Sequence, residues 1–266
     1  MIVTVDGRPA YAYTGARDFE PARDPIVFVH GGGLDHTVWL LQSRYFAHHG
    51  HGVLALDLPA HGKSAGEPLA SIEQMADWTM RLMDAGGVDT ATFIGHSMGA
   101  LVVHELAARH PGRVRRVVLV AVTVPMPVGE ALLSAARADS HDAFDMINIW
   151  GHGEKAGVGG NQAPGMWMMG CGMRLLERSA PGVLYSDLNA CNIYRNGLES
   201  TRRIACPVNV ILGREDRMSP VKAAGPMLEA LSDARLTVLE NCGHMIMAER
   251  PGELLDLLVK ALAGAD

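Results

Sequence analysis

The stretch that decides the fold is TFIGHSMGALVVHELAAR, from Thr92 to Arg109. The apolar run Thr92–Ile94 predicts a strand, and apolar residues three and four apart in Met98–Arg109 predict a helix. Ser97 lies on the sharp turn between them, with a glycine two residues to either side. This is the pattern of a nucleophile elbow, in which a strained backbone lifts the serine hydroxyl clear of the sheet and glycines prevent collisions.

Short apolar runs and helical patterns alternate through the rest of the chain. Further strands are predicted at Ile2–Val5, Pro9–Tyr13, Ile26–Val29, Val53–Leu56, Val114–Val122, Val208–Leu212 and Leu236–Leu239. Further helices are predicted at Val38–His48, Ser71–Ala85, Val221–Leu231 and Gly252–Leu262. The alternation predicts an α/β fold, in which helices flank both faces of a mainly parallel eight-stranded sheet. The first two strands, joined by a tight turn, are expected to form an antiparallel hairpin at one edge.

The alternation stops between Thr123 and Arg203, where the sequence is rich in Gly, Met and Trp. We interpret residues 123–203 as an inserted helical cap, or lid. Residues 1–122 and 204–266 are then expected to form the core that carries the sheet. The cap methionines, together with Trp150 and Trp167, are expected either to wall an apolar pocket or to form the cap's own core.

Composition restricts the classes of partner. The chain has 266 residues, of which 48% are hydrophobic, and 23 Lys and Arg against 29 Asp and Glu. The net charge of −6 provides no general basic surface for nucleic-acid phosphates or anionic lipid. The longest charge-free apolar stretch, Val117–Gly129, is interrupted by prolines and too short to span a membrane. We therefore expect no nucleic-acid and no membrane partner.

The N-terminus and the cysteines favour a reducing compartment. Met1–Val5 is followed by Asp6, Gly7 and Arg8, which is not a secretory signal pattern, so a cytoplasmic location is expected. Four cysteines lie far apart, without the close pairs of zinc or dithiol sites: Cys171, Cys191, Cys206 and Cys242. We interpret all four as reduced thiols that behave as small buried hydrophobes.

Two motif-like patterns do not meet the spacing that their chemistry requires. His104 and His110 lie six apart on a predicted helix, whereas a zinc-protease helix needs its two histidines four apart. Gly62, Lys63 and Ser64 end like a phosphate-binding loop, but Asp57 stands where that loop requires a glycine. We expect no metal and no cofactor.

Three motifs follow successive predicted strands. His30, Gly31, Gly32 and Gly33 follow the third strand, the run DLPAHGKS at residues 57–64 follows the fourth, and the serine elbow follows the fifth. In this combination and order the sequence resembles the α/β-hydrolase family over nearly its whole length. The resemblance implies that family's fold and a catalytic set in the chain order serine, acid, histidine.

The resemblance assigns the remaining members of that set. The strand Val208–Leu212 ends in a loop that matches the family's acid loop, which makes Asp216 the orienting carboxylate, with Glu215 as the alternative. His244, in the loop after the last strand, is the expected base. His96 adjoins Ser97, but on so tight a turn its side chain is expected to point away from the neighbouring hydroxyl.

A serine with such a base and acid supports acyl transfer through an acyl-enzyme. The resemblance places the oxyanion donors at the backbone amides of Gly32 and Met98, while His30 is expected to brace its loop. The pocket residues expected under the cap are Gly33, Trp150, Met166 and Trp167. An apolar roof favours an uncharged, small-to-medium ester as the small-molecule substrate.

Fold alone does not choose the reaction. The residues Gly33, Leu34, Val38 and Trp39 are similar to the carboxylesterase branch of the family that includes the pimeloyl methyl-ester esterase. A serine carboxylesterase is therefore the first expectation. The alternatives are a carbon-carbon bond hydrolase, a lactonase or a cofactor-free perhydrolase on the same residues, and a ligand receptor with residual hydrolysis. The sequence does not indicate the oligomeric state.

Overall fold

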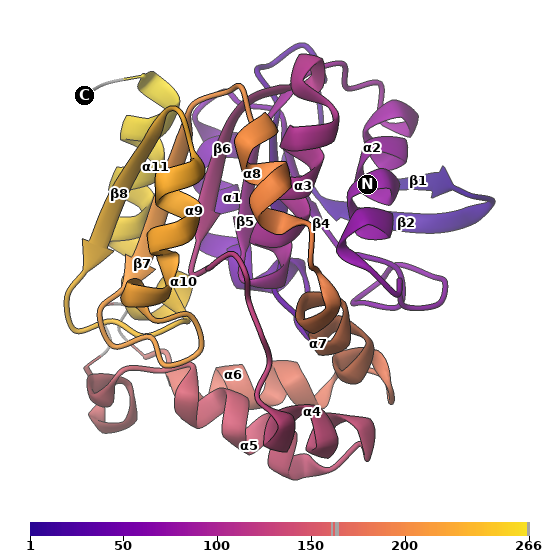
Figure 1. Ribbon diagram of the computed structural model, residues 1–266. Helices are drawn as coiled ribbons and strands as arrows, with labels where there is room; N and C mark the ends of the chain where they lie inside the picture. The colour runs from indigo at the N-terminus through magenta and orange to yellow at the C-terminus, as the bar shows by residue number, and fades with distance from the viewer. Residues whose placement is uncertain (161, 163–164, 265–266) are drawn as a thin grey trace.

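The computed structural model describes residues 1–160, 162 and 165–264, so residues 161, 163, 164, 265 and 266 of the predicted cap and core lie outside the described residues. It confirms an α/β architecture around one eight-stranded sheet (Figure 1). The strands are β1 (Ile2–Val5), β2 (Arg8–Tyr13), β3 (Ile26–Val29), β4 (Val53–Leu56), β5 (Ala91–His96), β6 (Val114–Val120), β7 (Val208–Gly213) and β8 (Ala234–Leu239). Their spatial order is β1-β2-β4-β3-β5-β6-β7-β8.

The sheet is parallel from β4 through β3 to β8, and β2 runs antiparallel to both of its neighbours. The hairpin predicted at one edge is therefore confirmed, and its turn places Asp6 and Gly7 at positive φ. Every residue of β3, β4 and β5 is buried, as expected for strands covered on both faces. The last predicted strand before the cap ends earlier than expected, at Val120, because Ala121 adopts a φ of 53°.

Helices cover the sheet on both faces. They are α1 (Leu40–His48), α2 (Ile72–Ala85), α3 (Met98–Arg109), α4 (Glu130–Arg137), α5 (His141–Trp150), α6 (Met168–Glu177), α7 (Val183–Ile193), α8 (Gly197–Arg203), α9 (Gly225–Ala230), α10 (Ile246–Glu249) and α11 (Pro251–Ala263). Short 3-10 helices occur at His36–Trp39, Pro111–Arg113, Glu154–Val158 and Val221–Ala224. One buried apolar cluster joins α2, α3 and α9 to the sheet, and a second joins α1, α10 and α11 to it.

The chain between β6 and β7 forms a further layer. Helices α4, α5 and α6 lie together beyond the end of the sheet toward which the β8 arrow points, and α7 leads back from them (Figure 1). Leu132 and Leu133 of α4 pack with Leu184 and Leu188 of α7 in a small apolar cluster of their own. Helix α8 returns to the sheet and contacts α3 and α9. The layer therefore lies over the carboxyl ends of the parallel strands, where open α/β sheets bind ligands.

Two findings bear on the composition-based expectations. No helix in the described part of the chain has the length and apolar character needed to cross a membrane. The cysteines are free, but only Cys191 and Cys242 are buried. Cys171 is exposed on α6 and Cys206, in the loop before β7, is partly exposed, so the prediction of burial is wrong for these two.

Candidate active site

Ser97 occupies a strained turn between β5 and α3. Its backbone has φ 53° and ψ −118°, a conformation that side-chain-bearing residues rarely adopt. A Cβ atom placed on Gly95 would lie 2.2 Å from the backbone oxygen of Gly99, and one placed on Gly99 would lie 2.4 Å from the backbone oxygens of Val29 and His30. Both glycines are thus required for the strand and helix to approach closely enough to form the turn.

His244 and Asp216 form a buried pair after the last two strands. Nδ1 of His244 lies 2.8 Å from Oδ2 of Asp216, and the backbone amides of Met218 and Ser219 donate to Oδ1 at 2.8 and 2.7 Å. Burial raises the pKa of Asp216, but the facing His244 and these donors outweigh it and lower the pKa below its ordinary value. An ionised carboxylate only accepts, so Nδ1 of His244 carries the proton and Nε2 is left as a base.

The alternative acid, Glu215, has a different partner. Its Oε2 accepts a hydrogen bond from the backbone amide of Glu154 at 2.8 Å. Glu215 thus holds the loop that follows α5, while Asp216 faces the histidine. The geometry therefore favours Asp216 as the orienting carboxylate.

Ser97 and His244 line one cavity of about 260 Å³, together with Gly31, Gly32 and Met98. Side chains from the four helices α4 to α7 complete its wall, and they include Leu132, Ile147, Trp150, Leu176 and Leu188. Among the described residues, no hydrogen bond joins Ser97 to His244. Catalytic hydrogen bonds are often long in the free enzyme and shorten once substrate is bound.

The turn at residues 30–33 is braced by His30, and we call it the oxyanion loop after the donor predicted at Gly32. Nδ1 of His30 donates to the carbonyl oxygen of Gly31 at 2.8 Å, and Nε2 accepts from the amide of Leu58 at 3.2 Å. Burial lowers the pKa of His30 to about 4, so its ring is neutral, in agreement with one donating and one accepting nitrogen. The loop lies against the elbow, since a Cβ on Gly31 would be 3.3 Å from Cβ of Ser97.

His96 forms no hydrogen bond with Ser97 among the described residues and contacts the His244 loop instead. Its Nε2 donates to the carbonyl oxygen of His244 at 3.0 Å, and the two imidazole centroids are 4.8 Å apart. Burial lowers the pKa of His96 to about 3, which keeps the ring neutral. His96 therefore holds the backbone of the His244 loop, a task that no pattern in the sequence indicated.

The chain after α5 also holds the His244 loop. The carbonyl oxygen of Gly151 accepts the amides of His244 and Met245 at 2.9 and 3.0 Å. The buried carboxylate of Glu249 accepts the amides of Gly153 and Gly243 at 2.8 and 3.1 Å. Sequence reasoning missed these contacts, because they join backbone groups and a glutamate far apart in the chain.

The residues expected to wall the pocket lie in different places. Trp150 lines the cavity with Ser97, whereas Gly33 and Met166 line separate hollows and Trp167 is 73% exposed. The ring of Trp167 lies over Gly170, where a Cβ would be 2.1 Å from Cε3, so it covers the start of its own helix. Gly33 packs instead toward Leu184.

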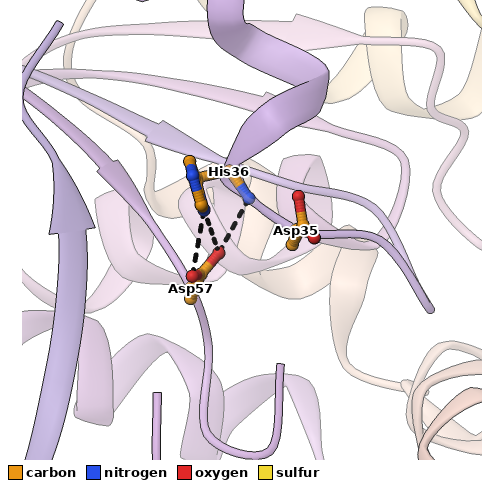
Figure 2. A group of neighbouring side chains, drawn as sticks. All are labelled: Asp35, His36 and Asp57. Carbon is orange, nitrogen blue, oxygen red and sulfur yellow. Dashed lines mark hydrogen bonds and ion pairs between the residues drawn. The ribbon is translucent and has the colours of Figure 1, made fainter. Parts of the chain in front are cut away.

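Asp35, His36 and Asp57 are the one group among the described residues with the composition of a metal site (Figure 2). Asp57, however, accepts hydrogen bonds from the backbone amide and Nδ1 of His36 and from the amide of Lys63, each at 2.8 or 2.9 Å. Asp35 accepts from Thr37 and forms an ion pair with Arg178. These donors occupy the carboxylates, so the group braces two loops and does not present open ligand atoms.

Comparison with known proteins identifies the family of this chain. A sequence model of the alpha/beta hydrolase family matches residues 26–257. The chain belongs to the α/β-hydrolase family. It is 28% identical over 264 residues to the pimeloyl-[acyl-carrier protein] methyl ester esterase of Aromatoleum aromaticum, covering 91% of this chain and 99% of that relative. It is 25% identical over 235 residues to the (E)-2-((N-methylformamido)methylene)succinate hydrolase of Acinetobacter baylyi, covering 86% of each.

Solved structures agree with this α/β hydrolase in fold. The enol-lactonase of Burkholderia xenovorans superposes with a TM-score of 0.86 at 22% identity, covering 99% of this chain and 100% of the other. A thermophilic esterase gives a TM-score of 0.82 at 24% identity, covering 99% and 97%. At these identities the likeness concerns the fold alone.

Proposed function

We propose that this α/β hydrolase is a serine esterase that cleaves a carboxylic ester of a small-to-medium apolar substrate through an acyl-enzyme. The observation that carries the proposal is the convergence of a serine elbow and a buried His244–Asp216 pair on one cavity. A histidine with one nitrogen held by a carboxylate and the other free is the arrangement that activates a serine.

In the proposed reaction, Nε2 of His244 takes the proton of Ser97 as its oxygen attacks the ester carbonyl. Asp216 holds the imidazole tautomer and stabilises the cation. The amides of Gly32 and Met98 donate hydrogen bonds to the carbonyl oxygen and stabilise the negative charge that develops on it. Met98 is the first residue of α3, so its amide has no partner within the helix. Losing one such donor typically costs about 3 kcal/mol of transition-state stabilisation.

The tetrahedral intermediate then collapses and expels the alcohol, which takes the proton from His244. A water molecule enters, loses its proton to His244 and attacks the acyl carbonyl. A second collapse releases the carboxylic acid and returns the proton to Ser97. Each step uses the same base and the same pair of amides, as the chemistry of acyl transfer requires.

We further propose that residues 123–203 act as a cap over Ser97 and set the size of the substrate. Their support is the apolar cluster within the layer and the contribution of α4 to α7 to the cavity wall. A cavity of about 260 Å³ with mainly apolar walls suits a short acyl chain or a small aromatic ester.

The test is hydrolysis of nitrophenyl esters of increasing acyl length by the wild type and by Ser97→Ala. We expect turnover of short, uncharged esters, a decline for long acyl chains, and loss of turnover in the variant. A clear preference for charged esters would contradict the apolar pocket. Turnover that survives Ser97→Ala would contradict the mechanism, and tight ligand binding without acyl-enzyme formation would favour a receptor.

A further inference from the structure

A second buried histidine–aspartate pair lies beside the oxyanion loop. Asp187, on α7, is fully buried and lines the same cavity as Ser97. Its Oδ2 accepts the backbone amide of Gly33 at 2.8 Å and faces Nε2 of His61 at 2.8 Å. A Cβ on Gly32 would lie 3.2 Å from Cβ of Asp187, so the aspartate also packs on the middle of the loop.

Both ring nitrogens of His61 face acceptors. Nδ1 lies 2.9 Å from the carbonyl oxygen of Pro59, and Nε2 lies 2.8 Å from Asp187. Because a neutral imidazole donates through only one nitrogen, both contacts are hydrogen bonds when His61 is a cation. Burial lowers the pKa of His61, but Asp187 and the Pro59 carbonyl outweigh it and raise the pKa above its ordinary value.

Several charged side chains lie near His61: Asp35, Lys63 and Arg178 line one hollow with it. Asp57 also raises its pKa, and His30, 4.7 Å away between ring centroids, is a neutral neighbour because burial lowers its own pKa. When His61 is a cation, it forms a pair without net charge with the carboxylate of Asp187. A neutral pair does not repel the negative charge that develops at the neighbouring oxyanion loop, whereas an isolated carboxylate would.

The hydrogen bonds at the loop fix the two peptide planes that flank Gly32. In a planar trans peptide the N–H and C=O point in opposite directions. His30 holds the carbonyl oxygen of Gly31, which belongs to the same peptide as the amide of Gly32. Asp187 holds the amide of Gly33, which belongs to the next peptide. Together they set the direction of the Gly32 N–H.

We propose that Asp187 is a positioning residue: it orients the Gly32 amide toward the oxyanion by holding Gly33, and the His61 cation holds Asp187 in place. The inference rests on the proposed function, because it assumes that the loop receives an oxyanion. It also makes the helical layer a contributor to the reaction, since α7 carries the aspartate.

The test compares Asp187→Ala, Asp187→Asn and the wild type with a nitrophenyl ester that the wild type hydrolyses. Asp187→Ala removes the acceptor of the Gly33 amide, and we expect kcat to fall by about 10-fold to 100-fold with KM changed by less than about 3-fold. Asp187→Asn keeps an acceptor oxygen, and we expect it to restore most of the lost kcat. NMR titration should show that the pKa of His61 is lower in Asp187→Asn than in the wild type.

The matched control is Glu105→Gln. Glu105 is another buried carboxylate, bonded at 2.5 Å to the hydroxyl of Tyr194 and remote from the loop, and we expect its variant to keep wild-type kcat. If Asp187→Ala does not fold, the kcat of Asp187→Asn and its His61 titration still test the positioning role of Asp187. An unchanged kcat in Asp187→Ala, or an unchanged His61 pKa in Asp187→Asn, overturns the inference. Ester turnover by the wild type, together with its loss in Ser97→Ala, tests the proposed function separately from the role of Asp187.

Discussion

The pairs His244–Asp216 and His61–Asp187 have the same distance between ring nitrogen and carboxylate oxygen, but their second ring nitrogens have different surroundings. In each, a ring nitrogen lies 2.8 Å from a buried carboxylate oxygen. The second nitrogen of His61 faces the Pro59 carbonyl, whereas that of His244 has no hydrogen-bond partner among the described residues. We propose that His244 is therefore able to take and return a proton, while both contacts of His61 favour its cationic form. The two histidines differ in the partner of the second ring nitrogen and not in the distance to the aspartate. We propose that a free second nitrogen suits a catalytic base, whereas a hydrogen-bonded one suits a structural role.

The largest expected effect distinguishes the proposed base, His244, from His36, a buried histidine outside the cavity. His244→Ala removes the proposed base, and we expect kcat to fall on the order of 10⁴-fold to 10⁶-fold. His36→Gln alters a third buried histidine–aspartate pair away from the cavity, and we expect kcat within about 2-fold of wild type. Steady-state hydrolysis of a short nitrophenyl ester measures both. A similar loss in both variants would contradict the assignment of His244 as the base.

The next largest effect on kcat distinguishes the carboxylate of Asp216 from that of Asp187. Asp216→Asn keeps the shape of the side chain but changes the protonation of His244, and we expect kcat to fall on the order of 10⁴-fold. Asp187→Asn keeps an acceptor for Gly33 and should retain most of its kcat. The ratio of the two kcat values is the measured quantity. Equal losses would mean that both aspartates act on the same proton transfer.

The third prediction concerns the buried pair His36–Asp57 and its contribution to the free energy of unfolding. His36→Leu removes one of the N–H donors of the fully buried Asp57. We expect the free energy of unfolding to fall by about 1–3 kcal/mol, because the buried carboxylate of Asp57 loses one of its hydrogen-bond donors. Urea unfolding monitored by circular dichroism measures the change. An unchanged unfolding free energy would show that the pair shown in Figure 2 does not brace the fold.

The smallest effect concerns pH. A raised pKa in the folded state means that His61 contributes stability that is fully present below its ordinary pKa of 6.5 and is lost as pH rises through the folded value. Asp187→Asn removes the main cause of the raised pKa. We therefore expect the difference in unfolding free energy between wild type and Asp187→Asn to shrink as pH rises above 6.5. A difference that stays constant would contradict a cationic His61.

The sequence predicted the parts of the site that carry a local pattern. Ser97, Asp216 and His244 each follow a recognisable strand, and the glycines around Ser97 reflect a turn that can be inferred from neighbouring residues alone. Asp187 carries no such pattern, because its partners His61 and Gly33 are 126 and 154 residues away. The same holds for the pocket wall, where the expected Trp167 lies on its own helix while helices distant in sequence supply the lining.

The most direct test of the central claim is to trap the acyl-enzyme. The wild type is mixed with a short-chain nitrophenyl ester, quenched in acid within the first turnover and digested, and the acylated peptide is identified by mass spectrometry. We expect one acyl group on Ser97, accompanied by a burst of one equivalent of nitrophenol, and neither in Ser97→Ala. An acyl group on another residue, or hydrolysis by Ser97→Ala at the wild-type rate, would contradict that claim.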